Sequence, residues 1–244
     1  MSFTSDLSVD ELLLVEETGF EPLELVMGTS YFNIGWQMSN WFQNQELGSI
    51  TQLMMRARQT AMARLLEQAI AFNADGIVGV RLDIHRHGHN AEFTVAGTAV
   101  KRRENDGDAW RTMGRPFTCD LSGGDFWALV RGGFRPVALA HGVCVYHVAH
   151  QGLSQWFQQI GQNCEQEQYT QALYDARELA MERMQYEAQQ LGASGIVNTR
   201  IIEGSHAWGS HVLELVAVGS AVAPLGNREE GAHETPELIA FAQD

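Results

Sequence analysis

Histidines at alternate positions are the clearest candidate for a metal site in this sequence. His85, His87 and His89 lie on one short run. On an extended segment alternate side chains share a face, so the three imidazoles can meet at one ion, and nitrogen ligands suit Zn, Cu or Ni. Gly88 and Asn90 place the run at a hairpin tip, where the alternation fails. A solvated polar turn is therefore the competing interpretation.

A second group of metal-type side chains recurs every three residues. It comprises His141, Cys144, His147 and His150. Ligands of these types suit Zn or Cu, and four of them would complete a tetrahedron. A three-residue period alternates faces on a strand and drifts around a helix, so the spacing favours packing residues instead. Cys144 beside a histidine also resembles a nucleophile with its base, but no third residue that orients the base is evident.

Aromatic pairs and arginines are the remaining candidates for a ligand or interface site. They are Trp41 with Phe42, Trp156 with Phe157, Arg58 with Arg177, and Arg81 with Arg200. The aromatic pairs either pack in a core or interface, or line an apolar pocket between subunits, and the first is favoured because aromatics dominate burial there. We expect the arginines to pair with carboxylates between elements or subunits, with an anion site as the alternative.

No catalytic signature accompanies these residues. The sequence has no GxSxG elbow, no HExxH helix, no phosphate loop and no GxGxxG turn. Lys101 is the single lysine, which leaves almost no chemistry that needs an amine. We therefore predict a protein that is not an enzyme. An enzyme working on a small molecule in a pocket between subunits is the third alternative, after the two functions given below.

The composition is that of a folded protein with an acidic surface. Of 244 residues 45% are hydrophobic, and the net charge of −14 opposes binding to nucleic acid or to an anionic membrane surface. Cys119, Cys144 and Cys164 form no CxxC pair, and the start is not signal-like, which predicts a reduced, cytoplasmic protein. The apolar stretches are too short to cross a bilayer.

An internal repeat sets the positions of these residues. The segment Phe3 to Ser8 returns as Phe117 to Ser122, a shift of 114 residues. Small insertions raise the shift to 119 between Arg58 and Arg177. Collinear matches of this kind indicate two copies of one domain.

The repeat divides the chain into four parts. We predict copy 1 at residues 1–103, a polar linker at 104–114, copy 2 at 115–223, and a polar C-terminal tail with a short helix at 224–244. The tail is expected to dock onto its own assembly or onto a protein partner.

Each copy is expected to contain a strand, a long helix and a pair of strands. The expected ranges are strands 22–28 and 136–146, helices 49–72 and 166–191, and strand pairs 76–84 with 91–100 and 195–202 with 211–223. A short helix comes first, in copy 1 from the capping box of Ser8 and Glu11 to Gly19, and copy 2 loosens it with Gly123 and Gly124 in the first turn. Asn73 stands where copy 2 has Gly192, at the end of the long helix.

This order of elements predicts an α+β fold: two tandem β-α-β-β copies, each with one long helix on a small antiparallel sheet. Such a unit leaves one sheet face and its edges unburied, so we expect self-association. A monomer in which one copy covers the other is the alternative.

The glycine-led strands carry a resemblance to a known family. The runs Ala74 to Arg81 and Ala96 to Val100, with their counterparts Leu191 to Val197 and Val218 to Val222, resemble the YbjQ-like family, which carries a heavy-metal-binding label. The resemblance implies a compact subunit that assembles into a pentameric ring, with a function that is largely undefined. With two copies in each chain, we expect five chains to form two stacked rings, one from each copy.

Taken together, these features predict a non-enzymatic, cytoplasmic, ring-forming protein that presents a ligand or docking surface. The alternative is a heavy-metal-binding protein that uses the histidine-rich hairpin of copy 1 to hold Zn, Cu or Ni.

Overall fold

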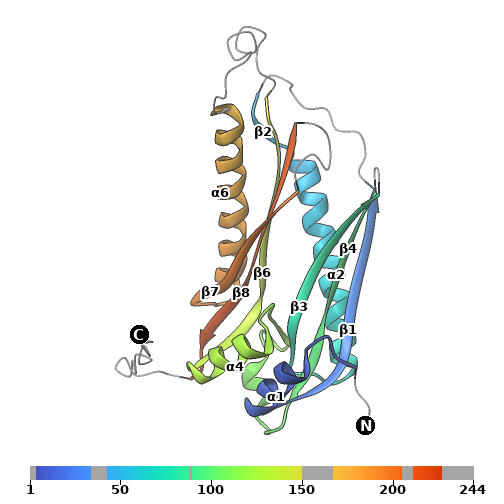
Figure 1. Cartoon of the computed structure of the whole chain (residues 1–244), viewed down its shortest axis with the longest axis vertical. Coiled ribbons are helices and arrows are strands. Elements are labelled where there is room, and N and C mark those ends of the chain that lie inside the picture. The colour runs from blue at the N-terminus through green and yellow to red at the C-terminus, as the bar shows by residue number, and fades with distance from the viewer. Residues whose placement is uncertain (1–3, 34–42, 88–89, 150–166, 205–210, 227–244) are drawn as a thin grey trace, which may run out of the picture.

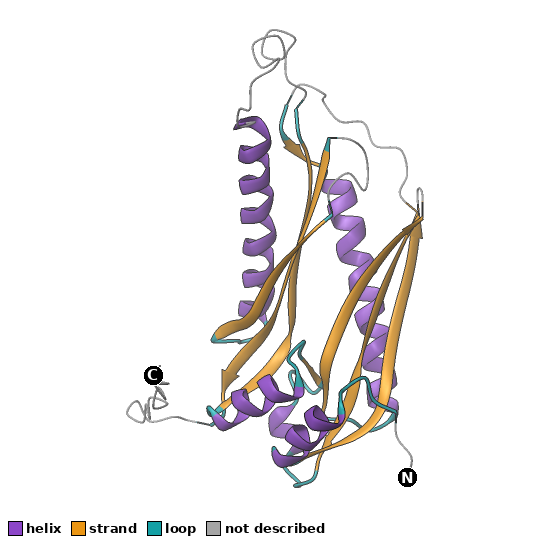
Figure 2. Ribbon diagram, viewed as in Figure 1, coloured by secondary structure: helices purple, strands orange, loops and turns teal. Residues whose placement is uncertain are grey.

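The chain folds into alternating layers of sheet and helix. A computed structural model describes residues 4–33, 43–87, 90–149, 167–204 and 211–226. In order, the layers are sheet A, helix α2 (Gly48–Ala71), sheet B and helix α6 (Glu167–Gln190). Figure 1 and Figure 2 show sheet A and α6 on opposite sides of this stack.

Each sheet has four strands, and each takes one short strand from the other half of the chain. Sheet A runs in the order β1 (Phe20–Asn33), β4 (Asn90–Arg102), β3 (Gly76–His87) and β5 (Phe117–Thr118). Sheet B runs in the order β2 (Gln45–Glu46), β6 (Phe134–His147), β8 (Val212–Pro224) and β7 (Gly195–Glu203). The β5 strand lies parallel to β3, and all other pairs are antiparallel. The short strands β2 and β5 therefore tie the two halves together.

The repeat is visible in strand register as well as in sequence. Leu25 pairs with Thr98 in sheet A, and its counterpart Leu139 pairs with Ser220 in sheet B. The pairing register shifts in β1 and in β6 just after a proline of each strand. It also shifts at matching places in β3 and β7. Asn73 and Gly192 both have a positive φ, at 57° and 74°. The predicted α+β fold of two tandem copies is confirmed.

Each long helix lies unusually close to its own sheet. A Cβ atom added to Gly142 of β6 would lie 2.7 Å from the Met184 nitrogen and closer still to the Ala180 oxygen of α6. Gly28 of β1 meets α2 in the same way, at Ala61 and Leu65. Both strands therefore need glycine at this position, because any side chain would push the helix away.

The largest core lies between the two copies. Val143, Val145 and Val216 of sheet B pack in the same buried cluster as Met54 and Leu65 of α2. Helix α2 is thus covered by its own sheet on one side and by sheet B on the other. Helix α6 packs against sheet B, through a separate cluster that includes a row of alanines.

A third cluster closes one end of the stack. Phe20, Phe117 and Phe126 pack there with Trp110, and the Phe20 and Trp110 ring centroids lie 4.9 Å apart. Helices α1 (Val9–Glu17) and α4 (Gly123–Arg131) pack against each other at this end, with α3 (Gly107–Trp110) nearby. The predicted capping box of Ser8 is present on α1.

The segment between the copies is anchored rather than free. Trp110 is buried although the segment around it is mostly polar, and Arg111 forms an ion pair with the buried Asp75 at 3.0 Å. Sequence patterning did not predict α3, because a four-residue helix leaves no periodic signal. The division at residues 103 and 115 stays a prediction. None of the described helices is both long and apolar enough to span a membrane.

Candidate functional site at the seam between the copies

The outer edge of β6 is closed by side chains rather than by a long strand. We call this contact of α2, β6 and α6 the seam. Four hydrogen bonds run along it: Arg58 Nη2 to Leu139 O at 2.5 Å, His141 N to Glu187 Oε2 at 2.8 Å, Arg183 Nη1 to Val143 O at 2.6 Å, and Val145 N to Thr51 Oγ1 at 3.0 Å. Arg58 and Thr51 come from copy 1, and the other side chains come from copy 2.

Two ion pairs cross the seam between the copies. Arg58 of α2 lies 2.5 Å from Glu187 of α6, and Arg183 of α6 lies 2.8 Å from Glu46 of β2. Burial tends to raise the pKa of Glu46, but its hydrogen bonds to Arg183 and Thr51 outweigh burial and hold that pKa below its usual value. The hydrogen bond to Glu46 raises the pKa of Arg183 in turn. The pair of Glu46 and Arg183 therefore stays ionised over a wide pH range. Both ion pairs fix how the copies sit together.

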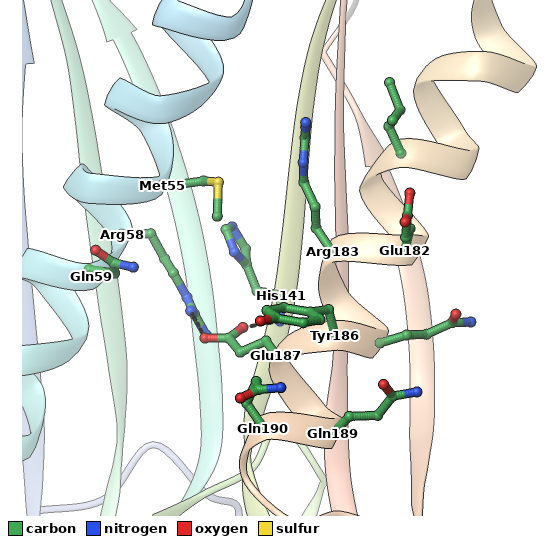
Figure 3. Close-up of a pocket in the computed structure, with 12 residues that line it drawn as sticks. Met55, Arg58, Gln59, His141, Glu182, Arg183, Tyr186, Glu187, Gln189 and Gln190 are labelled. Carbon is green, nitrogen blue, oxygen red and sulfur yellow. Dashed lines mark hydrogen bonds and ion pairs between the residues drawn. The ribbon is translucent and has the colours of Figure 1, made fainter.

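A cavity of about 560 Å³ opens along the seam between α2 and α6. Figure 3 shows Arg58, His141 and Tyr186 around it, with glutamines at its rim. His141 is 3% exposed, and its Nε2 has no hydrogen-bond partner among the described residues. Burial, helped by the charge of Arg58, lowers the pKa of His141 well below 6.5. The imidazole is therefore neutral at pH 7.

Replacing His141 by methionine is expected to remove an acid-dependent loss of stability. The unfolded chain binds a proton at His141 more readily than the folded chain does, because the pKa is lower in the folded state. Stability is then full above about pH 6.5 and falls below it, by up to about 1.4 kcal/mol per pH unit. Copy 1 carries Met27 at the same place, which makes methionine a natural replacement.

The measurement is urea unfolding between pH 7 and 5 on wild type, His141→Met and His85→Gln. The last is the control, because His85 is exposed. We expect a shallower pH slope for His141→Met alone. An equal slope in all three proteins would contradict the assignment.

The histidine-rich hairpin of copy 1 lies at one end of β3 and β4. His85 is exposed, and its backbone pairs with that of Glu92. His87 ends β3, and His89 lies outside the described residues. Within the described part of the chain no three His, Cys, Asp or Glu side chains gather as a metal site requires. Metal binding by this hairpin stays a prediction.

The structure separates the second group of candidate ligands. Cys144 packs in the core beneath α6, whereas His141 lies on the opposite face of β6, in the cavity beside α2. His147 is buried and lies an even number of residues from His141, on the same face. Burial raises the pKa of the Cys144 thiol to about 12, so it is no thiolate nucleophile at neutral pH. Cys119 is likewise buried with a pKa of about 12, and His150 and Cys164 lie outside the described residues.

The four candidate arginines differ in their partners. Arg58 pairs with Glu187 across the seam, Arg81 lies 3.2 Å from Asp6, and Arg200 lies 2.8 Å from Asp120. Arg177 is exposed on α6, and it forms no hydrogen bond or ion pair with any other described residue. The aromatic pairs Trp41 with Phe42 and Trp156 with Phe157 lie outside the described residues.

Several residues of the seam escaped the motif search. Glu46, Thr51, Arg183 and Glu187 belong to no recognisable pattern of catalytic or ligand residues. The repeat could have identified two of them, because Arg183 aligns with Arg64 and Glu187 aligns with Gln68. That alignment marks positions where both copies keep a polar side chain on the long helix.

Copy 1 contains only half of the corresponding seam. Gln68 Oε1 accepts a hydrogen bond from Met27 N at 2.9 Å, as Glu187 does from His141 N, and Arg64 donates to Thr29 O, as Arg183 does to Val143 O. An open hollow of about 540 Å³ borders these groups. The described residues place no second helix against β1 where α2 lies against β6.

Comparison with known proteins gives two findings. A family described as "Putative heavy-metal-binding", the YbjQ family, matches residues 20–103 and again 147–224. A curated protein of Mycobacterium tuberculosis, named as an encapsulin nanocompartment protein, is 48% identical over 231 residues. That alignment covers 93% of this chain and 88% of the relative.

Proposed function

The chain belongs to the YbjQ family as two tandem copies, and on that premise we propose that it is a non-enzymatic protein whose chains assemble into a closed homo-oligomer. The seam supports a structural role, because its charged side chains form hydrogen bonds with backbone oxygens and nitrogens and ion pairs with each other. The pKa values of Cys119 and Cys144 leave neither thiol reactive.

One observation carries the proposal: β1 exposes large apolar side chains on the far face of sheet A, the face turned away from α2. Leu25, Met27 and Tyr31 are 38%, 50% and 61% exposed there. Their counterparts on sheet B are Leu139, His141 and Val145, which are 3%, 3% and 0% exposed beneath α2. Monomeric proteins seldom expose a row of large apolar side chains, so this face is suited to an interface between chains.

The curated relative supports the same role. Its name places that relative in an encapsulin nanocompartment, and the identity extends over nearly the whole of both chains. We extend a part in such a compartment to this chain, with the assembly presenting a docking surface. The finer expectations are five chains per assembly and a partner held by the C-terminal tail at 224–244. Cytoplasmic location is a further prediction.

The full chain is expected to be an oligomer at micromolar concentration, with the mass of five chains. Mass photometry or sedimentation velocity measures this directly. A monomer at about 10 μM would contradict the proposal, and a mass of two, four or six chains would contradict the number five.

Metal binding is the second candidate, and the description of the family favours it. The hairpin with His85, His87 and His89 would hold the ion. Metal analysis of the same preparation, purified without a histidine tag, tests it. Less than about one tightly held ion per five chains would exclude a specific site.

A further inference from the structure

His141 brings a buried polar atom without a partner into the cavity of the seam. The residue is 3% exposed and lines the space of about 560 Å³ between α2 and α6. Its Nε2 has no hydrogen-bond partner among the described residues. We propose that this cavity binds a small uncharged phenol, whose hydroxyl group donates a hydrogen bond to His141 Nε2. The inference goes beyond the proposed function and does not rest on it.

The free nitrogen of His141 is a hydrogen-bond acceptor. Burial keeps the pKa of the imidazole well below 6.5, so the neutral ring carries a single hydrogen. A hydrogen bond with the residue's own backbone raises that pKa in part, as a ring N–H donated to a carbonyl does. Because Nε2 has no partner, the hydrogen in that bond is on Nδ1. The group that faces Nε2 in a ligand must therefore be a donor.

The fold itself does not require histidine at this position. Met27 is the counterpart in copy 1, and its backbone nitrogen donates to Gln68 as that of His141 donates to Glu187. A buried acceptor without a donor costs free energy, and a methionine would avoid that cost. One water molecule takes up only about 30 Å³, a small part of this cavity. A larger ligand that donates to Nε2 explains both the histidine and the space beside it.

The charges around the cavity favour an uncharged ligand. Arg58 lies 2.5 Å from Glu187, and Arg183 lies 2.8 Å from Glu46, so these four groups already neutralise each other. Glu182 is exposed at the rim, where water and salt screen its charge. An ion that entered the cavity would lose water without gaining a free counter-charge, which is costly.

The walls of the cavity suit a flat apolar ring. Figure 3 shows Met55 projecting from α2 and the Tyr186 ring from α6, with His141 on the strand between the two helices. Thioether and aromatic side chains both pack favourably against an aromatic ring. At the rim lie the amides of several glutamines, among them Gln59, Gln189 and Gln190. A phenol combines such a ring with a hydroxyl donor, and its polar substituents can bond the glutamines.

The probe for this site is para-hydroxybenzamide, which has the ring, the hydroxyl donor and an amide for the rim. Benzamide lacks the hydroxyl group, and para-hydroxybenzoate carries a charge. Ligand-observed NMR titration of the full chain at pH 7 measures the three dissociation constants. We expect about 1 mM or tighter for para-hydroxybenzamide, and binding at least about tenfold weaker for the other two.

Two substitutions of His141 separate the acceptor from its volume. His141→Met removes the acceptor and should weaken binding of para-hydroxybenzamide about tenfold or more, to the level of benzamide. His141→Gln keeps an acceptor oxygen on a side chain of similar length, and its dissociation constant should stay within about threefold of wild type. His85→Gln is the matched control, because His85 is exposed on another sheet.

The wall of the cavity is tested on α6. Tyr186→Ala should weaken binding of para-hydroxybenzamide about three- to tenfold, because the ring that packs against the ligand is lost. Tyr174→Ala is the matched control: the two tyrosines are 63% and 61% exposed on the same helix, but Tyr174 does not line the cavity. Circular dichroism and urea unfolding at pH 7 confirm that each variant is folded.

Three results would overturn the proposed site: no binding of para-hydroxybenzamide to wild type at about 10 mM, equal binding by wild type and His141→Met, or benzamide binding as tightly as para-hydroxybenzamide. Each of them leaves the proposed homo-oligomer untouched, because the mass of the assembly tests that function separately. A monomeric wild type that still binds the probe through His141 would contradict the proposed function and support this site.

Discussion

Arg58→Met is expected to lower the free energy of unfolding by about 3 kcal/mol. The substitution leaves Leu139 O without its donor and leaves Glu187 facing the cavity without its cation. Removing one member of a buried pair costs about 3–5 kcal/mol, and the lower end applies because Glu187 is one-third exposed. Methionine retains much of the apolar stem, so the loss reports the guanidinium rather than packing.

Urea unfolding at a fixed protein concentration measures this effect, with Arg56→Met as the control. Arg56 is exposed on the same helix, and its loss should cost less than about 0.5 kcal/mol. Because Arg58 acts within one chain, its effect should be equal at high and low protein concentration. A loss below about 1 kcal/mol would mean that the seam contributes little to stability.

Gly142→Ala is expected to destabilise the fold by about 3 kcal/mol. The new methyl group would overlap the Ala180 oxygen and crowd the Met184 nitrogen, both on the backbone of α6. Backbone cannot rotate away as a side chain does, so the helix must shift and the alanine cluster beneath it must loosen. Gly28→Ala should have the same effect on α2, because the repeat preserves the contact.

The control for both glycines is Gly48→Ala, where no atom lies within 4 Å of the added group. That change should be neutral or stabilising by up to about 1 kcal/mol, because alanine restricts the unfolded chain. Thermal and urea unfolding of the three variants make the comparison. Equal stability of Gly142→Ala and Gly48→Ala would show that α6 does not need its close approach.

The repeat made much of the fold predictable from sequence. A helix or strand predicted at equivalent positions of both copies is supported twice. Asn73 and Gly192, for example, mark the end of the long helix in each copy. The predicted strands were too short at β1, which continues to Asn33. The prediction missed β2, β5 and α3, because such short elements depend on what they pair with or pack against.

The candidate site was less predictable. Motif spacing drew attention to His141, Cys144 and His147 as a group, but strand alternation places Cys144 on the opposite face from the two histidines. Arg58 was recognised as a residue that joins elements or subunits, yet its partner Glu187 lies 129 positions away. No local pattern identifies a contact of that kind.

Sequence alone determined the duplication, the α+β elements and the kinship of the two copies, because periodicity and glycine positions are local properties repeated along the chain. The tertiary structure decided how the copies meet. It placed sheet B over α2, buried Arg58 while leaving Arg177 exposed, and filled the space above Gly76 but not above Gly195. The physical reason is that similar segments acquire different surroundings once one copy packs on the other, and burial depends on surroundings as well as on residue type.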